Sequence, residues 1–445
     1  MGKLFVGMGK GIFRRMTTVL LMVAAAMILA APAASAAPPT PEEDPFYAYA
    51  GTRPLSEIAP GTVLKTRTLS YHVVGIPLPV QAVQLLYRST SELGEPTVNV
   101  TSVLRPAITI GAPQVVAYGS FYDSLSPADE PSYAISGGLT LGGAIPQVES
   151  ALIGPSLLAD RTVVIADTEG EQADFAAGPE YGMNTLDSLR AALSSSATGL
   201  AATKKIGLIG YSGGAIATEW AAELAPSYAP TINSKLVGAA MGGVLVDPAH
   251  NLHYVEGSVS WAGVMPMAII GVSRAFHIDL TPYLSEYGKA IYAKLERASI
   301  ANVLAQYPGL TWAQLAKPEY PTPESIPVYV KTVNHLIMGT GGTPTTPLEI
   351  AQGALGELEG TAGNKPGIGE GDGVMIAGDV RSLARQYCSQ GDKVQYEQFP
   401  LGHITTAVPW IASAMTWLSA RFAGLPAPSN CSSIEPGNSL APITE

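Results

Sequence analysis

The chain has 445 residues, of which 47% are hydrophobic and only 14% are charged. Average soluble proteins carry roughly 25% charged residues, so this composition excludes intrinsic disorder and predicts a large buried core. Asp and Glu outnumber Lys and Arg by 36 to 25, which gives a net charge of −11. An acidic protein repels nucleic acid and anionic lipid headgroups, and we therefore exclude nucleic-acid binding.

The first 36 residues have the pattern of a secretory signal peptide. Four basic residues and no acidic residue precede the uncharged, mainly apolar run 16–31. That run is shorter than the ~20 residues of a membrane span. Ala34-Ser35-Ala36 follows and supplies the small side chains of a cleavage site. We predict removal of residues 1–36, a secreted or cell-envelope location, and a mature chain without a transmembrane segment.

Seven apolar, β-branched runs have the length of buried strands. Helical patterns separate several of them, and residues 181–196 place Met183, Leu186, Leu189 and Leu193 on one helix face. Apolar strands that alternate with helices predict an α/β fold with a doubly wound, mostly parallel sheet. The predicted strands are residues 98–104, 114–117, 162–166, 205–209, 236–240, 347–351 and 393–399.

The alternation of strands and helices stops between residues 246 and 326. Helical patterns at 283–299 and 312–315, together with proline-rich joints, replace the strands there. Residues 259–272 contain no charge, and they form either a buried core helix or an apolar lid over a pocket. We predict a first core part at 37–245, an inserted helical cap at 246–326, and a second core part at 327–424.

Cys388 and Cys431 are the only cysteines of the chain. In an exported protein the expected state is one disulfide, here tying the tail 425–445 to the core. Two unpaired buried thiols are the alternative. The chain has neither a Cys-x-x-Cys zinc spacing nor a His-Glu-x-x-His motif, so we expect no protein-bound catalytic metal.

The motif Gly210-Tyr211-Ser212-Gly213-Gly214 fits the pattern G-x-S-x-G. A predicted strand at 205–209 leads into it, and a predicted helix at 215–224 leaves it. Such a strand–turn–helix elbow needs glycines because the turn is tight, and it presents the serine Oγ at the carboxyl edge of the sheet. The sequence therefore predicts that Ser212 is a nucleophile; an ordinary glycine-rich turn is the alternative.

A serine nucleophile needs a histidine base, and His403 is the candidate. It follows the last predicted strand, comes directly after Gly402, and precedes a helical pattern at 406–420. Of the other histidines, His72 precedes Ser212, and we expect the remaining four, at 250, 253, 277 and 335, to lie in the cap or on the surface. A histidine in a surface loop is the alternative interpretation of His403.

The acid of the serine–acid–histidine order should follow strand 347–351 and precede His403. Asp379 lies in the helical run 374–388 and Asp392 in a turn, whereas Asp372 lies between two glycines on a loop that can turn inward. We predict Asp372. A phosphate cradle at 367–373 is disfavoured by two acidic side chains, and a calcium loop there lacks EF-hand spacing. The acidic candidates are Glu357, Glu359, Glu370, Asp372, Asp379 and Asp392.

With these motifs the chain resembles the secretory lipases of the fungal lipase-A type and their actinobacterial relatives. The resemblance implies an α/β-hydrolase core and a helical cap that carries the acyl tunnel. It implies a catalytic triad of Ser212, Asp372 and His403, with oxyanion donors at Asp123 and Gly213. The linker 353–371 is longer here, and a further cap disulfide of the fungal members is absent. The matching segments are 44–47, 84–90, 121–124, 167–170, 182–190, 210–214 and the residues Asp372, Cys388 and His403.

From the triad and the resemblance we expect a secreted serine hydrolase that cleaves acylglycerol esters through an acyl-enzyme. We expect no cofactor, and as partners a lipid or ester substrate and a lipid–water interface. A short-chain carboxylesterase and an acyltransferase of exported glycolipids are the alternatives within the enzyme class. A catalytically silent lipid-binding protein is the alternative outside it.

Overall fold

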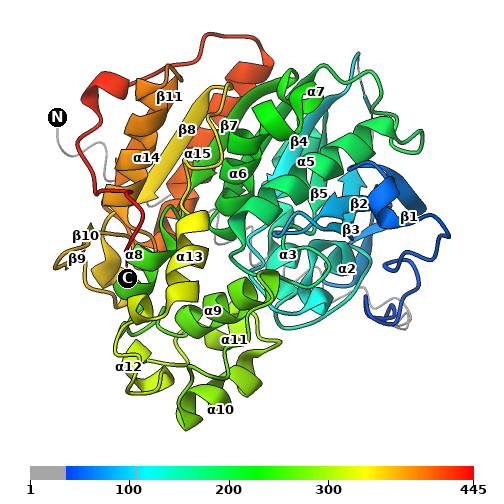
Figure 1. The fold of residues 1–445 in the computed structure, drawn as a ribbon. Coiled ribbons are helices and arrows are strands. Elements are labelled where there is room, and N and C mark those ends of the chain that lie inside the picture. Colours follow the sequence, from blue (N-terminus) through cyan, green and yellow to red (C-terminus); the bar gives the residue numbers. More distant parts are fainter. Residues whose placement is uncertain (1–36, 107, 110, 445) are drawn as a thin grey trace, which may run out of the picture. The chain divides into compact units, whose positions relative to one another are not determined.

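The computed structural model describes residues 37–106, 108–109 and 111–444, so the predicted signal peptide lies outside the described residues. Nine strands form one sheet in the order β1-β2-β3-β5-β4-β6-β7-β8-β11, and β9 and β10 form a separate hairpin (Figure 1). The strands are β1 Val63–Val73, β2 Ile76–Thr90, β3 Pro96–Leu104, β4 Gln114–Gly119, β5 Arg161–Ala166, β6 Lys205–Tyr211, β7 Leu236–Gly242, β8 Leu348–Gly353, β9 Asn364–Lys365, β10 Gly369–Glu370 and β11 Val394–Phe399.

The sheet is mostly parallel, as predicted. β1, β2, β3 and β5 pair antiparallel, and every pair from β5 across to β11 is parallel. In the centre, Gly210 of β6 pairs with Gly119 of β4 and with Met241 of β7. The end of β6, where Ser212 follows, therefore lies in the middle of the carboxyl edge of the parallel strands.

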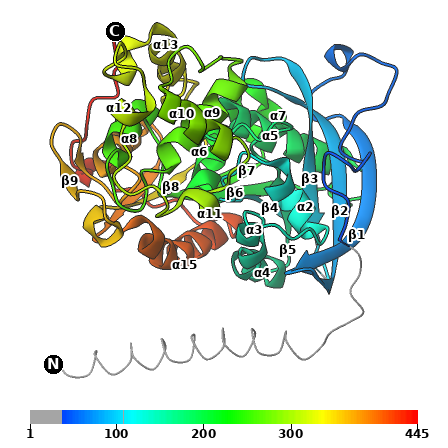
Figure 2. The same ribbon diagram turned by 90° about the horizontal axis from the view of Figure 1, so that it is seen from below.

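Helices cover both faces of the sheet (Figure 2). On one face α5, α6 and α14 pack with the strands into one apolar cluster, and on the other α2, α4 and α15 pack into another. This arrangement confirms the doubly wound fold. The helices of the sheet-packing layers and their connections are α2 Pro131–Ile135, α3 Ala144–Val148, α4 Ser150–Leu158, α5 Gly178–Ser194, α6 Gly213–Tyr228, α7 Pro230–Asn233, α14 Ala377–Ser389 and α15 His403–Phe422.

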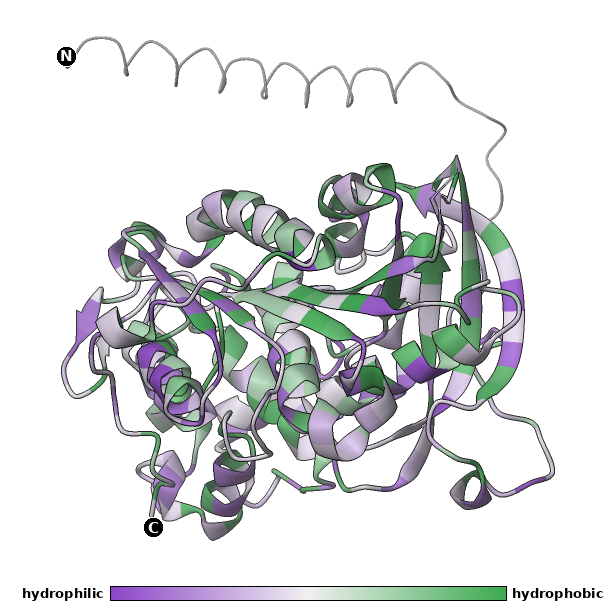
Figure 3. Cartoon of the chain, turned by 90° about the horizontal axis from the view of Figure 1, so that it is seen from above, coloured by the Kyte–Doolittle hydropathy of each residue, from purple (hydrophilic) through white to green (hydrophobic). Residues whose placement is uncertain are grey.

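The seven predicted strands all form, because a strand covered on both faces is apolar along its length. Every residue of β5 and of β8 is buried, and Figure 3 shows the apolar central strands between the helix layers. The prediction missed β1 and β2 at the edge of the sheet. In β1 the exposed Thr66, Thr68 and Ser70 alternate with less exposed neighbours, so no continuous apolar run marks this strand.

Between β7 and β8 the chain is helical, and within residues 243–347 the structure has isolated β-bridges but no strand. Buried side chains such as Met265, Met267 and Val303 form an apolar cluster of this segment that also contains Val374–Ile376 of the core. The stretch fits the predicted cap, and the division into core and cap stays a prediction. Its helices are α8 Pro248–Val255, α9 Val264–Ala275, α10 Glu286–Leu295, α11 Ile300–Val303, α12 Trp312–Leu315 and α13 Pro327–His335.

The disulfide between Cys388 and Cys431 is present, with an S–S distance of 2.03 Å. It joins the end of α14 to the C-terminal tail. Farther along the tail, Asn438 donates a hydrogen bond of 2.6 Å to Asp379 of the same helix. Among the described residues no helix combines the length and the apolar character that crossing a membrane requires.

Candidate active site

Ser212 lies on the sharp turn between β6 and α6. Its φ of +53° is a conformation that non-glycine residues rarely adopt, and its N–H donates to the Gly242 carbonyl at 2.9 Å. A Cβ on Gly210 would come within 2.0 Å of the Gly214 carbonyl oxygen, and one on Gly214 within 2.1 Å of the Gly119 oxygen. The two glycines are therefore required by close approach of backbone on either side of the serine.

A continuous chain of hydrogen bonds joins the three residues predicted as the triad. Ser212 Oγ lies 2.8 Å from His403 Nε2, and His403 Nδ1 lies 2.8 Å from Asp372 Oδ2. His403 is the first residue of α15, and its N–H donates to the Asp372 carbonyl at 2.8 Å. Tyr211, the neighbour of Ser212, donates its hydroxyl hydrogen to the His403 carbonyl at 2.5 Å.

Asp372 is fully buried and uses both carboxylate oxygens. Oδ1 accepts the N–H groups of Val374 and Met375 at 3.1 and 2.7 Å. Oδ2 accepts the Gln352 amide at 2.7 Å in addition to His403. The loop before α14 thus holds the carboxylate in one orientation. Gln352, at the end of β8, was not predicted as a site residue, since no motif marks it.

Asp123 and Gly213 also lie beside the nucleophile. Asp123 follows β4 and has a φ of +40°, and a Cβ on Gly213 would meet its Oδ1 at 1.8 Å. Its carbonyl accepts the N–H of Ile300 from α11, which anchors the loop to the helical segment. Within the described residues neither the Asp123 nor the Gly213 N–H donates a hydrogen bond.

Glu169 is hydrogen-bonded to the loop that contains Asp123. Its carboxylate accepts the Ser124 N–H at 3.1 and 3.2 Å and the Tyr181 hydroxyl at 3.1 Å, and its own N–H donates to Tyr122. Because Glu169 is buried, these contacts hold the loop of Asp123 in its unusual backbone conformation. Glu169 lies in segment 167–170 of the resemblance, and no motif marks it as a site residue.

Trp261 and Glu359 flank His403 on its other side. The Trp261 ring meets the imidazole edge-to-face at 5.3 Å, and its indole N–H donates to Glu359 Oε2 at 2.9 Å. Glu359 Oε1 accepts the Ile404 N–H at 2.7 Å. Glu359, one of the candidate acids, thus contacts the residue after His403 rather than the imidazole. Trp261 belongs to the apolar run 259–272, but its contact with His403 was not predicted.

Other candidate acids and histidines have partners outside the hydrogen-bonded chain of Ser212, His403 and Asp372. Asp379 contacts His250, with Nδ1 to carboxylate distances of 3.1 and 3.2 Å. His253 contacts Glu324, at 2.6 Å. Glu370 belongs to the β9–β10 hairpin.

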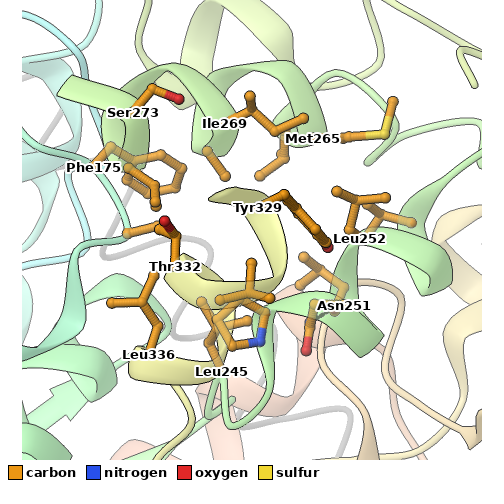
Figure 4. A pocket seen from close by; sticks show the side chains of 18 of the residues that line it. Phe175, Leu245, Asn251, Leu252, Met265, Ile269, Ser273, Tyr329, Thr332 and Leu336 are labelled. Atoms are coloured by element: carbon orange, nitrogen blue, oxygen red, sulfur yellow. Dashed lines mark hydrogen bonds between the residues drawn. The ribbon is translucent and has the colours of Figure 1, made fainter. Parts of the chain in front are cut away.

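An apolar cavity of about 150 Å³ extends from Ser212, Asp123 and Gly213 into the helical segment. Figure 4 shows side chains of α8, α9 and α13 that face one another across it. The run 259–272 contains both cavity-lining residues and core residues, so each of the two expected interpretations holds for part of it. Met265 and Ile269 of α9 line the cavity, whereas the fully buried Met267 belongs to the apolar core beside it.

The sequence pattern of the Secretory lipase family matches residues 137–363. Lipase 4 of Candida albicans is 30% identical over 408 residues, which cover 89% of this chain and 84% of that lipase. The chain belongs to the secretory lipase family. It is an ester hydrolase of the lipase type, as the resemblance implied.

Two further comparisons bear on this family member. The structure of Candida antarctica lipase A matches with a TM-score of 0.76 at 24% identity and covers 91% of both chains, which confirms the α/β-hydrolase fold. A Mycobacterium tuberculosis protein named a probable inactive lipase is 29% identical and covers 87% of this chain and 83% of its own length.

The charged groups around His403 in this lipase raise its pKa and so favour its protonated form. Burial alone would lower the pKa of His403, but the nearby Asp372 and Glu359 carboxylates, with Asp123, outweigh it and raise the pKa above its usual value. Burial raises the pKa of Asp123 to about 7, against the opposing effect of His403. Asp123 is therefore uncharged in acidic solution and becomes anionic as the pH passes neutrality.

Several carboxyl groups outside the site are also buried. Burial raises each pKa because the charged form loses its hydration. The pKa rises to about 8 for Glu149 and Glu349 and to about 7 for Asp167 and Asp174.

Proposed function

We propose that this protein is a secreted lipase that cleaves carboxylic esters of acylglycerols, with Ser212 as nucleophile, His403 as general base and Asp372 as the orienting acid. The observation that carries the proposal is the hydrogen-bonded chain from Ser212 through His403 to Asp372, which opens on an apolar cavity. An elbow serine with a base at 2.8 Å and an oriented base is the arrangement that acyl transfer needs.

In the acylation step Ser212 Oγ attacks the ester carbonyl carbon while His403 Nε2 accepts the hydroxyl proton. The carbonyl oxygen becomes an oxyanion, which the N–H groups of Asp123 and Gly213 stabilise. Asp372 keeps the proton of His403 on Nδ1 and stabilises the imidazolium. When the carbonyl re-forms, the C–O bond to the alcohol breaks, and His403 donates its proton to the departing oxygen.

Deacylation repeats these roles with water. His403 takes a proton from the water, the resulting hydroxide equivalent adds to the acyl-enzyme carbonyl, and the oxyanion again binds the two N–H groups. The C–O bond to Ser212 breaks, Ser212 regains a proton from His403, and the carboxylic acid leaves. No step requires a cofactor or a metal ion.

The cavity favours an uncharged ester with an apolar acyl chain. Asp123 carries the single charged side chain among the described residues that line it, and that group is neutral below about pH 7 because burial raises its pKa. A polar or charged acyl group would lose its hydration there without a partner. An acylglycerol meets these conditions better than a charged ester.

Secretion is part of the proposal. The predicted signal peptide at 1–36, with cleavage near Ala36, and the Secretory lipase family pattern both support it. The test is the fate of the full chain in an exporting host: the mature protein should be found outside the cytoplasm with an N-terminus near Ala37.

Initial rates of the mature protein on p-nitrophenyl esters and emulsified triglycerides of graded chain length test the activity. We expect hydrolysis of long-chain triglycerides that is lost in Ser212→Ala. Activity restricted to C2–C4 esters would favour the short-chain carboxylesterase. Transfer to an added alcohol or sugar that outcompetes hydrolysis would favour the acyltransferase. Binding of triglyceride without any turnover would favour a silent lipid-binding protein.

A further inference from the structure

Five exposed aliphatic side chains gather around Glu359, beside the proposed base. Their exposed fractions run from 37% for Leu355 to 63% for Val408. Exposed aliphatic residues scattered singly need no explanation, but a contiguous apolar patch marks an interaction site. We name this patch the apolar rim, and its members are Val259, Leu355, Leu358, Ile404 and Val408.

Backbone hydrogen bonds hold two segments of the rim together. The Val259 N–H, in the connection between α8 and α9, donates to the Gly360 carbonyl at 2.9 Å. Gly360 directly follows the short helix Gly356–Glu359, which contains Leu358. This contact places the α8–α9 connection of the proposed cap against the loop that follows β8.

The third segment is the start of α15. The Ile404 N–H donates to Glu359 Oε1 at 2.7 Å, and Val408 lies one helical turn beyond Ile404 on the same face. On the other side of this contact, the Leu355 N–H donates to the Leu401 carbonyl at 3.1 Å. The apolar rim is therefore one patch built from three parts of the chain.

The rim is continuous with the candidate active site. Glu359, at its centre, accepts the indole N–H of Trp261 at 2.9 Å. Trp261 packs edge-to-face on His403 and also lines the apolar cavity. The exposed apolar rim thus lies next to His403, the proposed base. The buried cavity begins at Ser212, the proposed nucleophile.

The charge around the rim selects a neutral partner. Residues 256–264, 353–363 and 399–411 contain neither Lys nor Arg, and the whole chain has a net charge of −11. Glu357 is exposed at the edge of the rim, with its carboxylate against Gly363. An anionic lipid surface would therefore be repelled, whereas an uncharged or zwitterionic one would not.

The area of the rim favours a lipid surface over a protein as the partner. Five partly exposed aliphatic side chains amount to a few hundred Å², the size of a functional patch on a monomer. A stable dimer needs roughly 800 Å² from each partner. A small apolar patch without cations beside an apolar cavity suits insertion into the surface of a neutral lipid aggregate.

We propose that the apolar rim is the surface by which this lipase docks on a neutral lipid–water interface. The proposal rests on the proposed function and adds to it the route of the substrate: an acyl chain can pass from the aggregate to the cavity beside His403. Docking removes the rim side chains from water, and that transfer supplies the binding free energy.

Lipid binding by a catalytically inactive variant tests the docking role independently of the proposed hydrolysis. Ser212→Ala, with and without Leu358→Ser and Val408→Ser, is mixed with triolein droplets coated with phosphatidylcholine, and the bound fraction is measured after flotation. Leu425→Ser is the matched control, because Leu425 is 59% exposed beyond the far end of α15, a helix about 30 Å long. Both altered positions are exposed, and equal melting temperatures of the variants verify folding.

We expect the double substitution to weaken partitioning onto the droplets by about tenfold or more, since two aliphatic side chains no longer leave water, and Leu425→Ser to leave it unchanged. In the active enzyme, the same double substitution should slow hydrolysis of emulsified triolein while hydrolysis of soluble p-nitrophenyl acetate stays within about twofold. Equal partitioning of all variants would overturn the docking role. So would binding that requires phosphatidylglycerol. Loss of p-nitrophenyl acetate turnover in Ser212→Ala bears only on the proposed function.

Discussion

The Asp372 carboxylate accepts hydrogen bonds on both sides, so Asp372→Asn changes its chemistry with almost no change in shape. The Val374 and Met375 N–H groups bind Oδ1 and will keep an oxygen there. The new amide NH₂ must then face His403 Nδ1 and the Gln352 amide, in place of Oδ2. His403 would have to accept at Nδ1 and carry its proton on Nε2, which prevents it from taking the Ser212 proton.

The magnitude follows from these contacts. In a comparable triad the same exchange lowers kcat by about 10⁴, and we expect a fall of roughly three to four decades, or about 4–5.5 kcal/mol in the barrier. The proposed oxyanion donors at Asp123 and Gly213 are unchanged in this variant, so residual activity should be measurable. Two amide groups with donors facing each other at Gln352 should lower the free energy of unfolding by about 1–3 kcal/mol.

Steady-state kcat and KM on p-nitrophenyl butyrate, with urea unfolding of the same preparations, measure both effects. Asp379→Asn is the matched control, because Asp379 is also buried but contacts His250 and Asn438. We expect this control to change kcat by less than about tenfold. The opposite ranking of the two variants would move the acid to Asp379. Near-normal rates in both would refute the role of Asp372.

Three other perturbations test separate parts of the account. Ser212→Ala should abolish ester hydrolysis and leave the melting temperature nearly unchanged, and more than a few per cent of residual activity would remove Ser212 as nucleophile. Ala268→Phe should fill part of the cavity that Ala268 lines and lower kcat/KM for C12 esters more than for C4 esters, whereas an unchanged ratio would show that acyl chains bind elsewhere. The free energy of unfolding should fall between about pH 5 and pH 8. Carboxyl groups whose pKa burial raises to about 7 or 8, such as Asp123 and Glu149, keep their protons in the native state and lose them when unfolded. Urea titrations at both pH values measure this, and a rise in stability would contradict it.

The sequence predicts most of the parallel part of the sheet because burial on both faces leaves a continuous apolar run, as in β5 and β8. It does not predict β1, where Thr66 and Ser70 are exposed and their neighbours are not. It does not decide whether the run 259–272 packs in the core or covers a pocket, because residues of one helix, α9, do each. One side of α9 lines the cavity, and Met267 packs in the core.

The predicted site residues come together because local chemistry marks each of them. Close backbone approach requires the glycines around Ser212, and glycines flank the loop of Asp372. The sequence marks Glu359 only as a candidate acid and Trp261 only as part of the apolar run 259–272, and no motif marks Gln352. Their contacts join residues that are between 20 and 98 positions apart, and no local pattern encodes such contacts.

The most direct test of the proposed mechanism is covalent trapping of the nucleophile. The mature protein is incubated with an uncharged p-nitrophenyl alkylphosphonate ester, and release of p-nitrophenol, loss of esterase activity and the labelled peptide are followed together. The account predicts one phosphonyl group per chain, carried by Ser212, with inactivation in proportion to labelling and no labelling of Ser212→Ala. A label on another residue, or full esterase activity after stoichiometric labelling of Ser212, would contradict it.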